Sequence, residues 1–307
     1  VHIQHEINIY GSLLSVIMFP LLLLILRLKK IKVVVTVHAL PALNQINKEF
    51  IHNFQSESKI KPGMLKFLFF LYYKLISIIA NKIIVHTNLI ADIYKKDYKA
   101  NKNKINIIPI GCHDLTDYNP DFKPYFLYMG YLVNRKGLQM VIDGFADFIK
   151  TNPNNPFELK IAGSAIKGQE FAKNKILEVI NFYSQDIKNK IHTLGFINQE
   201  QVDQYYKSAY AVVIPSKINI AASGPLSWAF SYGKCILASD IGNLQHDIKH
   251  NHDGLLIQNN YKNWSNAFKQ VASDFELVQK LQKNASIKAK QRNWINVAKM
   301  HDQIYQS

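Results

Sequence analysis

The sequence predicts an α/β fold with two doubly wound parallel sheets. Short apolar runs, typical of buried strands, alternate along the chain with segments of helical periodicity, and this alternation favours parallel sheets. Residues 114–124 contain Asp, Asn and two Pro without periodicity, which is typical of a linker. Because 307 residues are enough for two cores, we expect domains over residues 1–113 and 114–290, followed by a C-terminal helix over 291–307.

Each expected strand is a short apolar run, and each expected helix carries apolar residues at helical spacing. The expected strands cover residues 1–6, 31–37, 83–86, 105–110, 126–130, 158–162, 191–194, 211–215, 235–239 and 254–257. The expected helices cover residues 13–26, 63–80, 89–98, 137–150, 199–208 and 263–272, and amphipathic helices fill the tail over 276–305. Segment 13–26 is shorter than a membrane span and contains Pro20, so it favours a helix packed against a sheet.

Charge and cysteine content narrow the class of protein. The formal net charge is +15, and residues 1–112 hold 15 Lys and Arg against 5 Asp and Glu, so the basic character belongs mainly to the first third. The two cysteines, Cys112 and Cys235, give no disulfide framework and no zinc-ligand spacing, which favours a reducing, cytoplasmic compartment. No nucleic-acid recognition module accompanies the positive charge.

Residues 223–240 combine a loop, a short helix and a buried strand, and they have the chemistry of an anion site. Gly224 leaves backbone N–H groups accessible, and Pro225 suits the first helical position. The amides and the helix dipole would then converge on a negative ligand. Gly233 is expected to end the helix before the buried strand.

A basic pair, Arg135 and Lys136, follows the expected strand that ends at Gly130. Cations between a strand and a helix can face phosphates, although a solvated surface loop explains the same residues. Gly163 and Gly195 also follow strands. Several strands that end in glycine suggest a nucleotide lying across their carboxyl ends.

An imidazole, His38, follows another apolar run and would lie at a strand end in the first domain. It could face a substrate as a hydrogen-bonding or acid–base group, or it could be a structural residue that caps a loop. Similar strand-end positions are occupied by His5, Glu6, His86 and His113, to which we assign no role.

The helical segment 63–80 mixes aromatic residues with lysines and leaves two interpretations open. With Lys59, Lys61, Lys66 and Lys74 along it, the segment could lie on an anionic membrane surface. A buried helix with a solvated lysine edge explains the same pattern. Nucleic-acid binding is disfavoured because the aromatic residues are interleaved with aliphatic ones, as in a core.

Taken in order, these segments resemble the retaining family 4 glycosyltransferases of the GT-B fold. The matching motifs are residues 33–38, 80–87, 107–111, 128–137, 159–163, 194–196, 213–216 and 223–242. The resemblance implies two Rossmann-like domains with a cleft between them, the first lacking its N-terminal start, because the family's first strand and glycine-rich loop would precede Val1. It also implies hexosyl transfer from a UDP- or GDP-linked sugar to a glycan or lipid-linked acceptor, in surface polysaccharide or glycolipid synthesis at the inner face of the membrane.

The same resemblance implies roles for single residues. Lys136, with Arg135, would neutralise the donor diphosphate. The glycines after the strands, Gly130 and Gly163, would line the donor site. The amides around Ser223, Gly224 and Leu226 would hold phosphate or sugar oxygens, Phe196 would meet the base, and His38 would be the catalytic group near the transferred sugar. No metal or other cofactor is implied, because cations and a helix dipole stabilise the leaving diphosphate.

Three positions depart from the family pattern. The family's pair of glutamates, eight positions apart, would fall on Ile220 and Trp228, and the arginine that often follows the glycine of the lysine loop is Tyr131. A non-catalytic protein that keeps the fold and partners another enzyme is therefore the alternative to a glycosyltransferase. Fold alone does not decide between the two.

Overall fold

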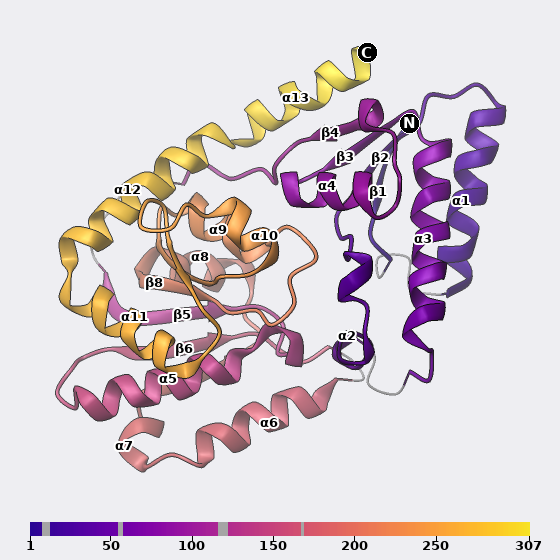
Figure 1. The fold of residues 1–307 in the computed structure, drawn as a ribbon. Helices are drawn as coiled ribbons and strands as arrows, with labels where there is room; N and C mark the ends of the chain where they lie inside the picture. The colour runs from indigo at the N-terminus through magenta and orange to yellow at the C-terminus, as the bar shows by residue number, and fades with distance from the viewer. Residues whose placement is uncertain (8–12, 55–57, 116–121, 167–168) are drawn as a thin grey trace. The chain divides into compact units, whose positions relative to one another are not determined.

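The structure is a computed structural model that describes residues 1–7, 13–54, 58–115, 122–166 and 169–307, and it divides into two compact units (Figure 1). Unit 1 comprises Val1–Ile110, Ile220–Ala222 and Ile295–Ser307, and unit 2 comprises Gly111–Asn219 and Ser223–Trp294. The domain limits expected from the sequence stay predictions. Most of the expected linker lies outside the described residues, and the end of the chain packs with unit 1.

Unit 1 contains a parallel sheet whose strands follow the chain order, β1-β2-β3-β4. The strands are β1 (His2–His5), β2 (Val34–Val37), β3 (Lys82–Val85) and β4 (Ile105–Ile107). The helices are α1 (Leu13–Leu28), α2 (Lys48–Phe54), α3 (Pro62–Ile79), α4 (Asn88–Lys96) and α13 (Trp294–Gln306), with short 3-10 turns at Leu43–Gln45 and Lys102–Lys104.

Both faces of the unit 1 sheet are covered. On one face α1, α3 and α4 contribute to a core that includes Phe19, Leu23 and Tyr73. On the other face Val34 packs against Val297 of α13. Strand β2 is buried along its whole length, as expected for a strand covered on both sides.

Three buried tyrosines fix α3 and α4 to the chain that leaves β2. Tyr73 donates its hydroxyl to the Ala39 carbonyl at 3.1 Å, Tyr98 donates to the Pro41 carbonyl at 2.7 Å, and Tyr94 donates to the Tyr73 carbonyl at 3.1 Å. Burial raises the pKa of all three phenols, so they remain neutral donors. The backbone just after His38 is therefore held by the core.

Unit 2 contains a six-stranded parallel sheet in the order β10-β9-β8-β5-β6-β7. The strands are β5 (Lys123–Met129), β6 (Glu158–Ala162), β7 (Ile191–Gly195), β8 (Ala209–Ile214), β9 (Cys235–Ser239) and β10 (Leu255–Ile257). The helices are α5 (Leu138–Thr151), α6 (Glu170–Asn181), α7 (Gln185–Lys188), α8 (Gln199–Ser208), α9 (Gly224–Ser231), α10 (Gly242–Asp247), α11 (Tyr261–Ser273) and α12 (Phe275–Gln291).

Alternate residues of the unit 2 strands point to opposite cores. Phe126 of β5 packs with residues of α5 and α11, whereas its neighbour Leu127 packs with residues of α9 and α12. Helices thus cover both faces of the sheet, and β8 and β9 are buried throughout. The two parallel sheets with covering helices confirm the predicted fold class.

The strand order of unit 2 reverses at β5. The chain runs from β5 through β6 to β7, and then crosses back to place β8 on the other side of β5. The helices that follow β5 and β8, α5 and α9, therefore pack on opposite faces of the sheet. In open parallel sheets ligands bind at the carboxyl ends of the strands beside such a reversal.

Gly163 provides a test of the packing at this edge. A Cβ at residue 163 would lie 1.8 Å from the Gly130 carbonyl oxygen, and its φ is +144°. We expect Gly163→Ala to lower the free energy of unfolding by about 2–4 kcal/mol, because backbone must move and the new side chain disfavours this φ. Denaturant unfolding of the purified chain measures the change.

The matched control is Gly63→Ala in the first turn of α3, where an added Cβ meets nothing within 4 Å. It should leave stability within about 1 kcal/mol of the wild type or raise it. Equal stability of the two variants would contradict the close approach at Gly163.

Candidate functional site

The carboxyl ends of β8, β5, β6 and β7 form one edge of unit 2, and we call this edge the strand-end site. The eight predicted donor-binding residues all lie on the loops or helix starts that follow these strands. They are Gly130, Arg135, Lys136, Gly163, Phe196, Ser223, Gly224 and Leu226. Parallel register pairs Tyr128 of β5 with Val213 of β8, so segments far apart in the sequence leave the sheet at the same edge.

Backbone hydrogen bonds continue past the ends of β5 and β6. The Gly130 amide donates to the Ala162 carbonyl at 3.0 Å, and the Gly163 amide donates to the Gly195 carbonyl at 2.7 Å. The three glycines thus follow adjacent strands. Phe196, directly after Gly195, has an 82% exposed side chain. At this end of the site the three glycines leave the backbone without side chains, and one aromatic ring, that of Phe196, is exposed.

The lysine loop, residues 131–137, is held in place by main-chain contacts. Residues Asn134–Lys136 form a 3-10 turn that ends at Gly137, whose φ is +66°. The Lys217 amide, after β8, donates to the Arg135 carbonyl at 2.8 Å. This bond joins the loops that leave β5 and β8 at the point where the strand order reverses.

Lys136 is a half-buried cation without a bonding partner in the described part of the chain, where its ammonium makes no ion pair or side-chain hydrogen bond. Burial and, to a smaller extent, the positive charge of Arg135 lower the pKa of Lys136 to about 8. An anion bound here would relieve both effects.

The loop after β8 is held by a buried polar network. Ser216 donates its amide to the Ser239 hydroxyl at 2.8 Å, and its carbonyl accepts from the Asn259 amide group at 2.8 Å. Asn219 accepts from the Asn243 amide at 3.0 Å. Lys217 and Asn219 lie in this loop and were not predicted as site residues. The sequence feature that could have indicated them is a polar stretch directly after a fully buried strand.

The start of α9 differs in detail from the expected anion site. The Leu226 amide donates to the Ser223 hydroxyl at 3.3 Å, so this pair forms a helix N-cap. The Leu226 side chain is buried in the core. An added Cβ at Gly224 meets nothing within 4 Å, so Gly224 offers the more accessible backbone. Gly233 has a φ of +56° directly after the helix, as expected for its end.

The two positions where glutamates were expected are occupied by structural residues. Trp228 stacks on His113 with ring centroids 5.3 Å apart and also on Tyr232 at 6.0 Å. Ile220 belongs to unit 1, where its carbonyl accepts from the Leu40 amide at 3.0 Å. Neither position supplies a carboxylate.

In unit 1, His38 lies at the carboxyl end of β2 and bonds to two side chains from neighbouring strands. Its Nδ1 lies 3.0 Å from Nε2 of His86, after β3, and its Nε2 lies 2.7 Å from Oε1 of Gln4, in β1. Burial, and then the charge of His2, lowers the pKa of His38. Burial therefore favours the uncharged imidazole.

His86 fixes the tautomer of His38. His86 Nδ1 lies 2.8 Å from the Ile108 carbonyl, which can only accept, so the hydrogen of a neutral His86 is on Nδ1. Its Nε2 then accepts from His38, which places the His38 hydrogen on Nδ1 and the lone pair on Nε2. Because Gln4 Oε1 cannot donate to this lone pair, this tautomer requires the Gln4 amide group in its other orientation, with –NH₂ toward His38 Nε2. No role was predicted for His86. The only sequence feature that indicated one is the position of a histidine directly after a strand.

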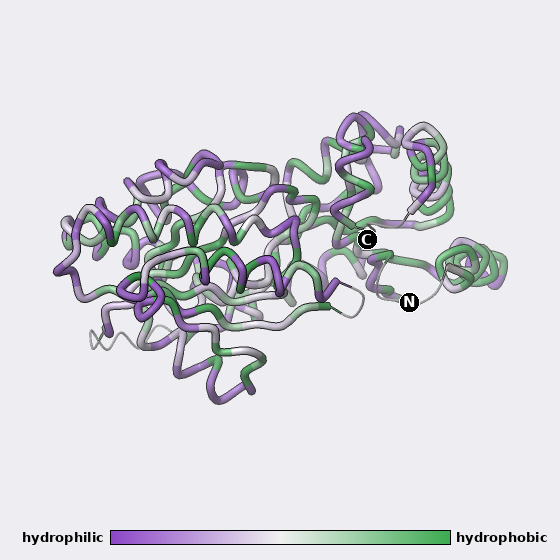
Figure 2. The backbone as a smooth tube through the Cα atoms, turned by 90° about the horizontal axis from the view of Figure 1, so that it is seen from below, coloured by the Kyte–Doolittle hydropathy of each residue, from purple (hydrophilic) through white to green (hydrophobic). Residues whose placement is uncertain are grey.

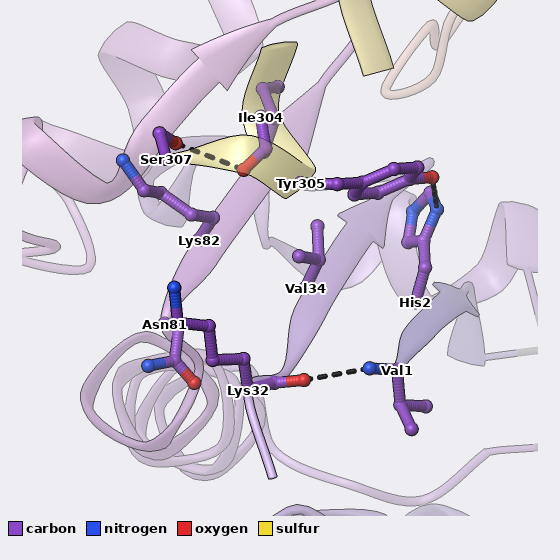
Figure 3. Close-up of a pocket in the computed structure, with 9 residues that line it drawn as sticks. All are labelled: Val1, His2, Lys32, Val34, Asn81, Lys82, Ile304, Tyr305 and Ser307. Atoms are coloured by element: carbon purple, nitrogen blue, oxygen red, sulfur yellow. Dashed lines mark hydrogen bonds between the residues drawn. The ribbon is translucent and has the colours of Figure 1, made fainter. Parts of the chain in front are cut away.

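Three cavities among the described residues are lined by other residues than the predicted donor-binding ones. A cavity of about 430 Å³ lies at the amino ends of β1–β3, between Lys32, Lys82 and Tyr305 (Figure 3). A second of about 600 Å³ lies among α5, α6 and Tyr261. A small one of about 30 Å³ touches Gly137 and Lys217 beside the lysine loop. We therefore define the strand-end site by its topology and charge.

Comparison with known proteins identifies the family. The sequence pattern of the family described as "Glycosyl transferases group 1" matches residues 118–288, more than half of the chain. The chain belongs to this family. The matched range covers nearly all of unit 2 and includes the whole strand-end site.

Individual relatives agree with the family assignment. The chain is 27% identical over 187 residues to an uncharacterized glycosyltransferase from Methanocaldococcus jannaschii, which covers 60% of this chain but 45% of that relative. The chain therefore spans less than half the length of this relative.

Solved structures match over both units. HepE from Anabaena, solved in complex with UDP-glucose, has a TM-score of 0.74 at 15% identity, over 96% of this chain and 76% of HepE. Sucrose-phosphate synthase from Thermosynechococcus elongatus has a TM-score of 0.73 at 20% identity, over 91% of this chain and 69% of the synthase. At these identities the matches show a shared fold, that of the GT-B glycosyltransferases.

The hydrogen bond between His38 and His86 can be tested without a substrate. Removing the acceptor with His86→Leu should lower the population of the His38 tautomer that carries hydrogen on Nδ1. Two-bond ¹H–¹⁵N spectra of histidine-labelled protein distinguish the tautomers. His113→Leu, in unit 2, is the control and should leave the His38 signals in place. An unchanged His38 tautomer in folded His86→Leu would contradict the assignment.

Proposed function

We propose that this protein transfers a hexosyl group from a nucleoside diphosphate sugar to a glycan or lipid-linked acceptor. The observation that carries the proposal is the position of Arg135 and Lys136 beside the reversal of strand order in unit 2. The chain that holds them belongs to the glycosyl transferases group 1 family. A diphosphate leaving group needs positive charge where its negative charge develops. The lysine loop supplies that charge on a fixed backbone.

We propose a UDP-linked donor first, because HepE was solved with UDP and with UDP-glucose. Lys136 and Arg135 would face the diphosphate, and Lys217 would add a third cation from the adjacent loop. The Gly224 amide would contribute at the start of α9, where the helix dipole favours an anion. Backbone at Gly195 and the ring of Phe196 would receive the base.

His38 would act on the sugar as a neutral hydrogen-bonding group. With hydrogen held on Nδ1 by His86, its Nε2 can accept from a sugar hydroxyl once Gln4 moves aside. The cations make a metal ion unnecessary for stabilising the diphosphate, which supports a metal-independent reaction without a further cofactor. Retention of configuration rests on the resemblance to family 4 alone. The setting we propose is surface polysaccharide or glycolipid assembly in the cytoplasm.

Binding of UDP should depend on pH through Lys136. The pKa of this ammonium is lowered to about 8 in the free protein, so it is charged at pH 7 and largely neutral at pH 9. If UDP binds the charged form, its apparent affinity should fall about tenfold between these two pH values, with proton uptake on binding at pH 8 to 9. Isothermal titration calorimetry in buffers of different ionisation enthalpy measures both quantities.

Lys136→Gln should bind UDP weakly at every pH, with no such slope. Lys150→Gln, an exposed lysine at the end of α5, should behave as the wild type. A wild-type affinity that stays constant from pH 7 to pH 9 would contradict a role for Lys136 in holding the diphosphate.

A non-catalytic nucleotide-binding protein is the second candidate, because structural residues occupy both positions where the family has glutamates. Release of UDP or GDP from sugar donors, measured together with thermal stabilisation, separates the candidates. Turnover that falls at least about 100-fold in Lys136→Ala supports the transferase. Stabilisation by a donor without turnover supports the second candidate, and stabilisation that persists in Lys136→Ala would remove the proposed site as well.

A further inference from the structure

Two neighbouring helices of unit 1 expose apolar side chains along their outer faces. In α1 these residues recur at helical spacing and form one stripe; they are Leu14, Ile17, Met18, Leu21, Leu22, Leu24, Ile25 and Leu28. In α3 a second stripe contains Met64, Phe67, Leu68, Leu71, Leu75 and Ile78. Leu14 is 68% exposed and Phe67 is 63% exposed. We call the two stripes together the apolar face.

Figures 1 and 2 show α1 and α3 side by side, and in Figure 2 both helices are seen nearly end-on with hydrophobic residues around them. The helices of unit 2 differ: α12 buries Val278 and Leu281 but exposes charged residues such as Lys280 and Lys283. A surface helix ordinarily keeps its outer side polar. An apolar patch spanning two helices marks a surface that binds something.

The inner sides of both helices belong to the core, so neither helix is free to leave unit 1. Phe19 and Tyr73 are buried beneath α1 and α3, and the Tyr73 hydroxyl is bonded to Ala39. The Lys104 ammonium donates to the carbonyls of Ser77, Ile78 and Ala80 at 2.8–3.0 Å, which fixes the end of α3.

Among the described helices, α3 is long and apolar enough to cross a membrane. If α3 crossed a membrane it would have to leave the sheet that it covers, because it lies in the chain between β2 and β3 and packs against that sheet. A position along a surface is compatible with the fold, whereas a transmembrane position is not.

The charged residues of α1, α3 and their immediate flanks, residues 13–32 and 58–85, are all basic. No Asp or Glu occurs in residues 13–32 or 58–85. Basic residues lie at the end of α1 (Arg27, Lys29, Lys30 and Lys32) and at the start of α3 and along it (Lys59, Lys61, Lys66 and Lys74). Apolar helices edged by cations are complementary to anionic headgroups over acyl chains. A second copy of this basic surface would bring like charges together.

We propose that α1 and α3 dock this protein on an anionic lipid bilayer, lying in the plane of the interface with the apolar face inserted among the acyl chains. Helices of 16 and 18 residues are about 24 and 27 Å long, and the two together present a broad apolar footprint. The sequence left a core role for residues 63–80 open. The structure assigns the inner side of α3 to the core and leaves its outer side for lipid.

Vesicle binding tests the surface without any sugar donor, so its outcome does not depend on the proposed reaction. The probe is the 307-residue chain mixed with phosphatidylcholine vesicles containing about 30% phosphatidylglycerol, with pure phosphatidylcholine as the uncharged comparison. Binding is measured by flotation. We expect binding to the anionic vesicles, weaker binding to the uncharged ones, and loss as salt is raised.

Two variants separate the apolar and electrostatic contributions. Ile17→Gln, Leu21→Gln, Phe67→Gln and Leu71→Gln together should weaken binding at least about tenfold. Lys29→Gln, Lys59→Gln and Lys61→Gln together should remove the preference for anionic lipid. These positions are exposed, so the fold should persist, and thermal unfolding verifies it.

Matched controls lie on unit 2. Phe182→Gln with Ile287→Gln removes exposed apolar side chains there, and Lys262→Gln with Lys280→Gln and Lys283→Gln removes exposed lysines. Both controls should bind vesicles as the wild type does. Equal loss in the controls, or unchanged binding in the apolar-face variant, overturns the proposal.

Sedimentation in the absence of lipid tests the competing occupant. If the wild-type chain is a dimer that the apolar-face substitutions convert to a monomer, and if it does not float with vesicles, the surface is an interface between copies and the proposal is wrong. A monomer that floats only while its apolar face is intact supports it.

Discussion

The close approach of Gly163 to the Gly130 carbonyl is the constraint on which the strand-end site depends. Backbone hydrogen bonds continue from Gly130 to Ala162 and from Gly163 to Gly195, beyond the regular strands. A side chain at residue 163 would push these segments apart. With the strand ends locked, the lysine loop leaves β5 from a fixed point. The reversal of strand order then places the loop after β8 against it, where the Lys217 amide bonds to Arg135.

Burial of a lysine has different consequences in different surroundings. Burial lowers the pKa of Lys234 to about 7, but its ammonium donates to the Lys207 and Ala209 carbonyls and lies over the Phe122 ring, so it is a structural group. Lys136 is also desolvated, but it has no such bonds within the described residues. A cation held without partners beside a strand-order reversal is poised for an external anion. The supply of internal acceptors, rather than the lowered pKa, distinguishes the two lysines.

Unit 1 combines a polar strand end with an apolar outer surface. Gln4 of β1 and His86 after β3 are both hydrogen-bonded to His38 after β2, so residues from neighbouring strands orient His38. The tyrosine network holds α3 against the sheet, which prevents its outer leucines and phenylalanines from turning inward. The same core thus fixes a hydrogen-bonding group at one edge and an unpartnered apolar face on the outside.

The sequence by itself determined the alternation of strands and helices and the glycines that follow the strands, because local periodicity and turn chemistry are written in neighbouring residues. It also predicted that the candidate donor-binding residues lie at one edge, since parallel strands align their carboxyl ends. Tertiary structure alone decided that His86 bonds to His38, that Ser223 caps Leu226, that Trp228 joins an aromatic stack and that residues 295–307 pack with unit 1. It also decided which side of α1 and α3 is covered. These features depend on contacts between residues far apart in the chain, and an apolar residue is equally apolar whether it faces a core or a membrane.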